Sequence, residues 1–406
     1  MQGRFHLTSA ALVALAVSVS GCGGGGGGQD AGLPKDYPTP ILVSETLRFA
    51  ALDASQAHTC GTALDGSTWC WGINEVGELG TSAALDLCDI PAITLVACTG
   101  TPQRVAGAPV FTALATSLGS GHSCGITAAG AAWCWGFGAG GQLGDGRSAN
   151  STLPVAVAGG LAFSVLRAST SSYATCGLTA GGEGWCWGPA SDLFGGGGSG
   201  VAASPVRVDW GRRFVDLDLG ELHGCGLAAD GRAWCWGSNW YGQLGVGSAG
   251  GSGGLARSGT PLAVVGDRAF RSIASGSDHS CALDAAGAAW CWGVAMALGS
   301  PTAVPDYVGT PQAVAGGHVF TALASGQLHT CGLTAQGEVW CWGQNYNGEL
   351  GDGSRTAAQT PVRVDTGVRF DRLAHRATCA LTADGQAWCW GSNIFGQVGR
   401  RSHWAR

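Results

Sequence analysis

The sequence has little charge, little methionine and no apolar segment long enough to span a membrane. Charged residues make up 12% of the 406 residues, and methionine occurs twice. Lys and Arg form no block, so the basic patch typical of nucleic-acid-binding proteins is missing, and we expect no nucleic-acid partner. The apolar run at residues 7–19 is too short to cross a bilayer.

Sequence motifs of catalytic sites are missing as well. There is no Gly-x-Ser-x-Gly elbow, no His-Glu-x-x-His and no phosphate-binding Gly-x-x-x-x-Gly-Lys-Ser/Thr. We therefore expect a protein that is not an enzyme and that has no cofactor and no metal. Asp216, Asp218 and Glu221 form an acidic group that we interpret as a solvated loop, not as an acid/base pair.

Glycine, cysteine and tryptophan are abundant. The chain has 72 Gly, 17 Cys and 17 Trp, and 45% of its residues are apolar. Many glycines together with regularly spaced tryptophans indicate short strands joined by tight turns. The apolar fraction is ample for a core, which argues against global disorder.

The first residues are typical of an export signal. A short polar start and the apolar run are followed by Val19-Ser20-Gly21-Cys22 and then by Gly23–Gly28. This segment resembles the lipobox of bacterial lipoproteins, which implies cleavage before Cys22 and acylation of that cysteine. We predict a signal peptide at 1–21, a glycine-rich tether at 22–38 and a lipid-anchored protein of the cell envelope, at the outer membrane or cell surface. The alternative is an ordinary signal peptide cleaved elsewhere.

One unit repeats seven times along the rest of the chain. The tetrapeptide Trp-Cys-Trp-Gly starts at Trp69, Trp133, Trp185, Trp234, Trp290, Trp340 and Trp388. A phenylalanine opens each copy, at Phe49, Phe111, Phe163, Phe214, Phe270, Phe320 and Phe370. A Gly-x-Leu-Gly segment follows the tetrapeptide but is degraded in the third and fifth copies, and a Pro-x-x-Val closes most copies.

The unit resembles the repeat of the regulator of chromosome condensation (RCC1) family, in its cysteine-rich bacterial secreted form. The sixth copy shows it best, as HTCGLTAQGEVWCWGQNYNGELGDG at 329–353. The resemblance implies an all-β, seven-bladed β-propeller at residues 39–399, with a short tail at 400–406. Both tryptophans of each copy lie on one face of the second strand, so we expect both to pack between neighbouring blades.

The ends of the repeat array predict how the ring closes. The seventh copy stops at Gly399 and lacks its Pro-x-x-Val, while Thr39-Pro-Ile-Leu-Val at the front matches Thr360-Pro-Val-Arg-Val. We expect the N-terminal strand to complete the last blade, because closure removes the exposed edges of an open array.

The cysteines fall into pairs ten residues apart, apart from Cys22. The pairs are Cys60 with Cys70, Cys88 with Cys98, Cys124 with Cys134, Cys176 with Cys186, Cys225 with Cys235, Cys281 with Cys291, Cys331 with Cys341 and Cys379 with Cys389. In the repeats, a three-residue turn ending in Gly places the two cysteines opposite each other, and export favours disulfides. Buried free thiols and, less well, zinc ligands are the alternatives, since this spacing is unlike a zinc ribbon.

Histidine precedes the first cysteine of most copies by two residues. The histidines are His58, His122, His223, His279 and His329, and the other two copies have Ala174 and Ala377 there. A ring of histidines suggests a metal site. We favour instead one repeated structural hydrogen bond, because no carboxylate recurs beside them to orient the rings.

The first copy carries an insertion near residues 81–99 that the repeat does not explain. It is apolar, and we expect a Cys88–Cys98 disulfide to hold it rigid as a binding loop on the propeller rim. Its candidate contact residues are Leu85, Leu87, Ile90, Pro91, Ile93, Leu95 and Val96. The alternative is a decorated loop without a partner. A second irregular loop, at 247–259, is too rich in glycine to be rigid.

The leading hypothesis for function is a monomeric binding scaffold at the cell envelope. Its partner would be an envelope or extracellular protein, with a polysaccharide as the alternative. The family resemblance implies two further hypotheses, a secreted inhibitor of β-lactamases and a guanine-nucleotide exchange factor. Clustering of the non-repeat loops on one face would favour a protein partner.

Overall fold

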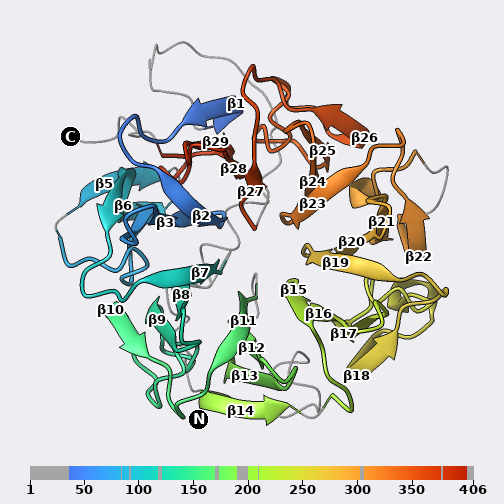
Figure 1. The fold of residues 1–406 in the computed structure, drawn as a ribbon, viewed down its shortest axis with the longest axis horizontal. Coiled ribbons are helices and arrows are strands. Elements are labelled where there is room, and N and C mark those ends of the chain that lie inside the picture. Colours follow the sequence, from blue (N-terminus) through green and yellow to red (C-terminus); the bar gives the residue numbers. More distant parts are fainter. Residues whose placement is uncertain are drawn as a thin grey trace, which may run out of the picture.

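A computed structural model describes residues 36–399, except 84, 91–92, 118–120, 170–172, 190–199, 209, 302–305 and 376–377. Within this part of the chain, seven sheets stand around one axis like the blades of a propeller (Figure 1). The predicted all-β, seven-bladed fold is confirmed. No helix among these residues is long and apolar enough to cross a membrane. Cys22, the predicted signal peptide and the predicted C-terminal tail lie outside the described residues.

Each blade has four strands in the same order from the axis outward. The inner strands are β2 (Phe49–Ala54), β7 (Phe111–Thr116), β11 (Phe163–Ala168), β15 (Asp216–Leu219), β19 (Phe270–Ser275), β23 (Phe320–Ser325) and β27 (Arg372–Leu373). The second strands are β3 (His58–Ala63), β8 (His122–Thr127), β12 (Thr175–Thr179), β16 (His223–Leu227), β20 (His279–Asp284), β24 (His329–Thr334) and β28 (Cys379–Leu381). The third strands are β4 (Thr68–Ile73), β9 (Ala132–Gly136), β13 (Gly184–Pro189), β17 (Ala233–Ser238), β21 (Ala289–Val294), β25 (Val339–Gly343) and β29 (Ala387–Ser392). The outer strands are β6 (Ile93–Arg104), β10 (Ser151–Ala156), β14 (Val201–Val208), β18 (Arg257–Ala263), β22 (Tyr307–Ala313), β26 (Ala358–Arg363) and β1 (Asp36–Leu42).

Three further elements lie outside this pattern. The first blade has a fifth strand, β5 (Asp86–Ile90), which pairs with β6. Two short 3-10 helices, η3 (Gly250–Ser252) and η4 (Ala295–Ala297), follow the third strands of the fourth and fifth blades.

The second and third strands of each blade form the predicted hairpin. Cys331 on β24 lies opposite Cys341 on β25, and Gly337 takes the positive φ of 77° that the turn between them requires. The other six blades place their two cysteines opposite each other in the same way.

All eight predicted cysteine pairs are disulfide-bonded in the structure, which confirms the predicted pairing. The bonds join Cys60 to Cys70, Cys88 to Cys98, Cys124 to Cys134, Cys176 to Cys186, Cys225 to Cys235, Cys281 to Cys291, Cys331 to Cys341, and Cys379 to Cys389. The alternatives of free thiols and of zinc ligands are therefore wrong for these sixteen cysteines.

The core lies between the blades and repeats around the ring. The disulfide of one blade packs against the opening phenylalanine and the second tryptophan of the next, as Cys60–Cys70 does against Phe111 and Trp135. The second tryptophan of every copy has no exposed surface. The first is only partly buried but packs against the same interblade clusters, so the prediction that both tryptophans pack between neighbouring blades is confirmed. The first tryptophan lies nearer the end of the hairpin, where one side chain such as Arg212 over Trp234 covers its ring.

In the described residues, the Gly-x-Leu-Gly segment links neighbouring blades. In the first blade, the Glu78 carbonyl accepts the indole N–H of Trp135 at 2.9 Å, while Leu79 is buried between the blades. Gly80 has a φ of 64°, and a Cβ there would lie 2.5 Å from Val105, so the position requires glycine. The fifth copy looks degraded in sequence but keeps the contact, because the Ala297 carbonyl accepts from Trp342.

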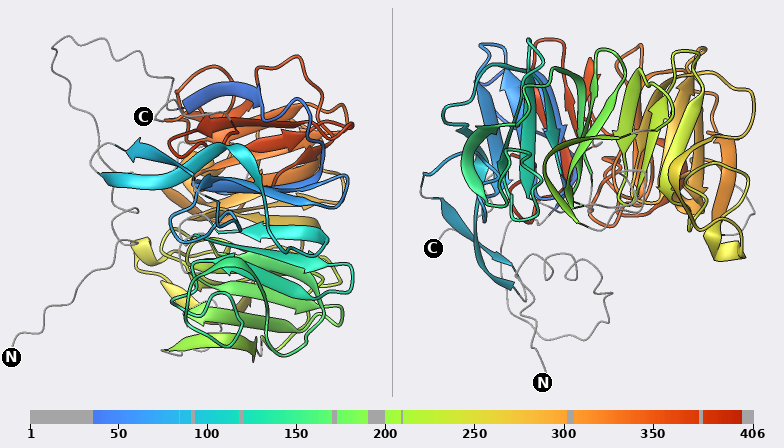
Figure 2. Two further views of the ribbon diagram at one scale, coloured as in Figure 1. Left: turned by 90° about the vertical axis from the view of Figure 1, so that its left-hand side faces the viewer. Right: turned by 90° about the horizontal axis from the view of Figure 1, so that it is seen from below.

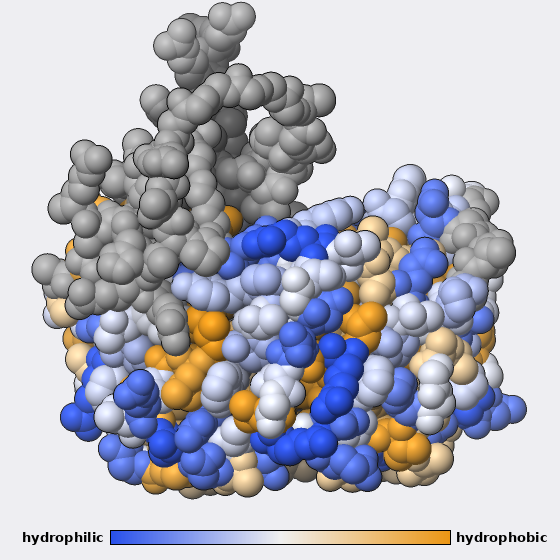
Figure 3. Space-filling view, turned by 90° about the horizontal axis from the view of Figure 1, so that it is seen from above, coloured by the Kyte–Doolittle hydropathy of each residue, from blue (hydrophilic) through white to orange (hydrophobic). Residues whose placement is uncertain are grey.

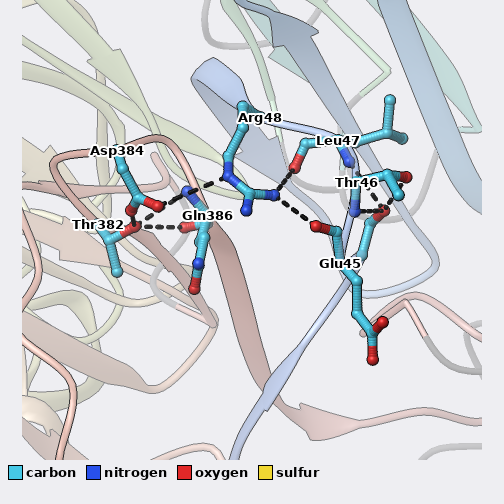
Figure 4. Close-up of polar contacts among 8 residues, drawn as sticks. Glu45, Thr46, Leu47, Arg48, Thr382, Asp384 and Gln386 are labelled. Carbon is cyan, nitrogen blue, oxygen red and sulfur yellow. Dashed lines mark hydrogen bonds and ion pairs between the residues drawn. The ribbon is translucent and has the colours of Figure 1, made fainter.

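The ring closes between the two ends of the chain, as predicted. Strand β1 pairs with β29 and completes the seventh blade, with Ile41 opposite Cys389. Strand β1 begins at Asp36, ahead of the predicted start of the propeller at Thr39. On the side shown in Figure 4, Arg48 donates to the Glu45 and Leu47 carbonyls and lies 3.6 Å from Asp384 in the last hairpin turn. This junction therefore contains polar contacts as well as apolar ones.

Proline marks the outer edge of the ring. The outer strands carry Pro40, Pro102, Pro154, Pro205, Pro261, Pro311 and Pro361. Each of these prolines lies where the register of the outer strand shifts. Proline and bulges interrupt a hydrogen-bonding edge and so oppose pairing with another chain. Figure 3 looks at this rim from the side of β1 and β26 and shows apolar residues in small groups between polar ones.

Candidate binding face

The loops that depart from the repeat project from one face of the ring. This face, called the loop face below, carries the turns from inner to second strands and from third to outer strands. The β5–β6 hairpin and η3 both project there, on the same side of the ring in Figure 2. Clustering on one face is the arrangement that the sequence-based hypothesis associated with a protein partner.

The insertion in the first copy is a β-hairpin, not an irregular loop. Cys98 on β6 lies opposite Asp86, and the disulfide joins it diagonally to Cys88 on β5. Cys88, Cys98, Val96 and Ile73 form a small buried cluster at the base of the hairpin. Ile394 and Phe395 of the seventh blade pack against this cluster, so the hairpin is fixed to two blades.

Only part of the predicted contact surface is available on this hairpin. Leu87 is 48% exposed, whereas Val96 is 5% exposed. Leu85 is half-buried and packs against the core between the first and second blades. Both Val96 and Leu85 pack toward the ring, which leaves little of either side chain available to a partner, and the contact role of the hairpin stays a prediction. Ile90, Ile93 and Leu95 lie within β5 and β6, and Pro91 lies outside the described residues.

The second irregular loop is held by hydrogen bonds despite its glycines. The Asn239 amide donates to the carbonyls of Ser248 and Leu255, both at 2.8 Å. Gly247 N–H donates to the Gly309 carbonyl of the next blade. The expectation that residues 247–259 are too glycine-rich to be rigid is wrong, because backbone bonds replace the missing side-chain packing. The loop leaves Trp240 54% exposed on the loop face.

Charged residues of three blades meet near the ring axis. Asp216 and Asp218 lie on β15, and Asp218 is buried. Arg167 on β11 lies 3.5 Å from the Asp216 carboxylate and 3.7 Å from that of Asp218. His375, just after β27, brings Nε2 to 3.3 Å from Asp218 Oδ1, and Figure 1 shows β27 and β15 on opposite sides of the axis. The interpretation of both aspartates as a solvated loop is wrong; of the three acids, Glu221 alone follows the strand.

Aspartates on the inner strands also accept backbone N–H groups from the inner strand of the next blade. Asp218 Oδ2 accepts the Ser275 N–H at 2.6 Å, and Asp53 accepts the Thr116 N–H at 3.0 Å in the same way. Burial raises the pKa of Asp216, against the lowering effect of Arg167. The cluster is engaged with backbone and ion-pair partners, which is the arrangement of a structural element that ties blades together.

The repeated histidines form one interblade hydrogen-bond chain. His58 Nε2 lies 2.8 Å from the Ser123 hydroxyl of the next blade, and that hydroxyl donates to the Glu78 carbonyl. The same ring nitrogen meets a hydroxyl for His122 with Thr175, His223 with Ser280 and His279 with Thr330. The predicted structural role is confirmed for these four. The exception fits too: Ala174 replaces histidine in the third copy, and Gly224 stands where the next blade would supply the hydroxyl.

Burial makes three of these histidines poor bases. It lowers the pKa of His58 and of His223 to about 4 and the pKa of His279 to about 3. Neutral imidazoles are therefore the folded form at neutral pH. No group of three or more His, Cys, Asp or Glu side chains within the described part of the chain could hold a metal ion.

Glu78 is a buried acid where three other copies have glutamine, at Gln142, Gln243 and Gln397. Burial raises the pKa of Glu78 to about 7 from an ordinary value of 4.5, so its stabilising contribution is complete below pH 4.5 and is lost as the pH rises through 7. We expect Glu78→Gln to raise the free energy of unfolding at pH 8 by about 1–3 kcal/mol and to change it little at pH 5. Urea unfolding at both pH values measures this.

A matched control for Glu78 exists in the sixth blade. Glu349 occupies the same turn and accepts the Asn347 backbone N–H at 2.9 Å, as Glu78 accepts the Val76 N–H at 2.8 Å, but its carboxylate also accepts the Asn347 side-chain amide at 2.7 Å. Glu349→Gln should give no gain at pH 8. Equal stability of Glu78→Gln and the unmodified protein at both pH values would show that Glu78 is solvated.

Comparison with known families finds the repeat directly. Two models described as regulator of chromosome condensation (RCC1) repeat match residues 129–178, 230–283 and 336–378, and residues 214–243, 320–349 and 375–397. Human E3 ubiquitin-protein ligase HERC2 is 28% identical over 181 residues, which cover 44% of this chain and 4% of HERC2. The mitochondrial RCC1 domain-containing protein RUG3 of Arabidopsis thaliana is 26% identical over 156 residues, covering 36% of this chain and 31% of RUG3. The chain thus spans a small part of these relatives.

Solved structures share the fold at low sequence identity. Human WBSCR16 superposes with a TM-score of 0.71 at 17% identity, covering 87% of this chain and 89% of that one. Yeast RCC1 (Prp20), solved bound to Kap60, gives 0.68 at 19% identity, covering 84% and 79%. These likenesses concern the propeller fold.

Proposed function

Because this chain belongs to the RCC1-repeat propellers, we propose that it is a non-enzymatic binding scaffold whose loop face holds a protein partner at the cell envelope. The β5–β6 hairpin is the element that makes the primary contact. The observation that carries this proposal is the clustering of the hairpin and η3 on one face, while the repeat accounts for the rest of the ring.

The hairpin has the properties of a preformed contact element. The Cys88–Cys98 disulfide and the packing of Ile394 and Phe395 against the buried cluster fix its base before any partner binds. Ordering a loop on binding costs free energy, so a hairpin that is already ordered binds more tightly for the same contact area. Leu87, exposed on β5, and Trp240, exposed on the same face, are suited to contact a protein surface.

The envelope location rests on two features. Cys22 ends an apolar run and precedes a glycine-rich tether, as at a lipidation site. Eight disulfides within one chain suit an oxidising compartment, since such bonds are rare in the cytosol. In this proposal the acyl group at Cys22 holds the ring at a membrane surface, and the tether lets the loop face reach its partner.

Capture from crosslinked cells tests the scaffold function. We expect the tagged, lipidated chain to retain a specific envelope protein, and a variant lacking residues 82–98 to lose it. The ring should stay folded, because the deletion keeps residues 99–104 of β6, which pair with β4. Cys22→Ser should move the protein out of the membrane fraction while the purified ring still binds the captured protein.

The controls separate the hairpin from the rest of the ring. A Leu87→Asp variant keeps the disulfide and should weaken capture, whereas Leu153→Asp on the outer strand β10 should not. If the partner persists in the deletion variant, its site lies on the repeat faces and the role assigned to the hairpin is wrong. If no protein is captured at all, the ligand of the scaffold is a glycan and not a protein. If the captured partner is a secreted hydrolase, the scaffold is an inhibitor.

A further inference from the structure

Strand β5 is the one outermost strand of the described sheets that carries no proline. The first sheet runs β2-β3-β4-β6-β5, so β5 pairs with β6 on one side and forms the end of the sheet on the other. The outer strands of the other six blades each contain a proline at a register shift. Those edges are protected against pairing, whereas β5 is not.

The position of β5 makes its edge accessible. The hairpin extends beyond the loop face in Figure 2, so a second strand could lie along β5 without contacting the blades. The disulfide and the buried cluster around Cys98 hold the hairpin in place. Addition of a strand to such an edge forms main-chain hydrogen bonds, and side-chain pairing supplies the specificity.

The sequence of β5 favours one kind of partner strand. It reads Asp-Leu-Cys-Asp-Ile, with two acidic residues and no basic one. Pairing two copies of β5 would place four aspartates in one short ladder, which like-charge repulsion disfavours. A strand that alternates basic and apolar residues would bring positive charge to this acidic segment on one face and an apolar surface to the exposed Leu87 on the other.

We propose that β5 binds an extended segment of a partner protein by strand addition, and that this segment alternates basic and apolar residues. The proposal rests on the proposed scaffold function and specifies how the hairpin recognises its partner. The first blade then has a six-stranded sheet in the complex.

The test uses an acetylated and amidated dodecapeptide of alternating Lys and Val with the full-length protein. We expect binding, and slowed amide hydrogen exchange in residues 85–90 when the peptide is present. The same peptide with its four central amides N-methylated cannot pair by either edge and should bind at least tenfold more weakly. Asp86→Lys with Asp89→Lys should cost at least tenfold as well, whereas Asp365→Lys, beyond β26, should not.

Three results would overturn the proposal. Equal binding of the N-methylated peptide would mean that charge alone attracts it. Protection confined to other strands would place the site elsewhere, and a dimer of the free protein that Leu87→Asp dissolves would make a second copy the occupant. Loss of partner capture on deleting residues 82–98, without exchange protection of β5, would leave the scaffold function intact and reject strand addition alone.

Discussion

Deleting residues 36–46 should lower the free energy of unfolding by about 5 kcal/mol or more, which is the scale of a whole domain's stability. The deletion removes β1, the outer strand of the seventh blade, and Val43, which is buried with Trp71 and Val398 at the closing junction. It also removes the Val43 N–H bond to Ala387 and the ion pair between Asp36 and Arg355. The inner strand β27 and the second strand β28 of this blade have two and three residues, and they are the shortest of the described strands.

The measurement is thermal unfolding followed by tryptophan fluorescence and by circular dichroism. Both transitions should shift together, because the closing junction supports every blade through its neighbours. Deletion of the longer segment at residues 82–98 is the control and should shift them much less. If the shortened chain fails to fold, point variants test the same junction. Val43→Ala should lower the free energy of unfolding by about 1–3 kcal/mol, as much as Val364→Ala does at an internal junction. Unchanged stability of both Val43→Ala and the deletion would show that the ring is held without β1.

The repeat made most of this fold predictable. Seven copies of one unit predict seven blades, and the truncated last copy predicts that the first strand completes the ring. Cysteines ten residues apart across a three-residue turn lie opposite each other, so the disulfides follow from the hairpin. These inferences depend on short-range geometry that every blade repeats.

The errors fall where contacts join different blades. Asp218 stands four residues after Phe214, as Arg167 does after Phe163 and Asp53 after Phe49, while the remaining copies have alanine there. That alignment could have placed these residues on inner strands, but it gives no sign of the contact between His375 and Asp218, which joins two distant blades. The burial of Val96 was not predictable either, because residues of the last blade, Ile394 and Phe395, pack against its cluster. A contact of that kind depends on ring closure and leaves no local pattern.

Acidification from pH 6.5 to about 4 should unfold the ring while its disulfides remain intact. A buried histidine with a lowered pKa binds its proton more readily in the unfolded chain, so stability is complete above the unfolded pKa of 6.5 and falls as the pH drops toward the folded pKa. For His58 and His223 the window ends at about pH 4, and for His279 at about pH 3. Each shift is worth about 3 kcal/mol or more, so three of them approach the stability of a typical domain.

Two acids with raised pKa values, Glu78 and Asp278, change the free energy of unfolding in the opposite direction as the pH falls. Burial raises the pKa of Glu78 to about 7 and that of Asp278, with help from the charge of Glu221, to about 6. Their protonation stabilises the fold as the pH falls, and this gain is complete near their unfolded pKa values. The free energy of unfolding should therefore change little between pH 7 and 6 and fall steeply below 5. Protonation of the buried histidines causes the steep fall below pH 5.

The histidine assignment is tested in a Glu78→Gln background, where the largest opposing group is absent. His58→Gln keeps an N–H donor for Ser123, and we expect it to reduce the loss of stability between pH 6.5 and 4 by about 3 kcal/mol. His318→Gln is the matched control, since His318 is only half-buried against Trp340 and should leave the slope unchanged. Urea unfolding at pH 7, 5.5 and 4.5 gives the slopes. If His58→Gln and the unmodified chain lose stability equally, acid acts on the ring through its carboxylates, and the interblade histidines stay neutral or are solvated on protonation.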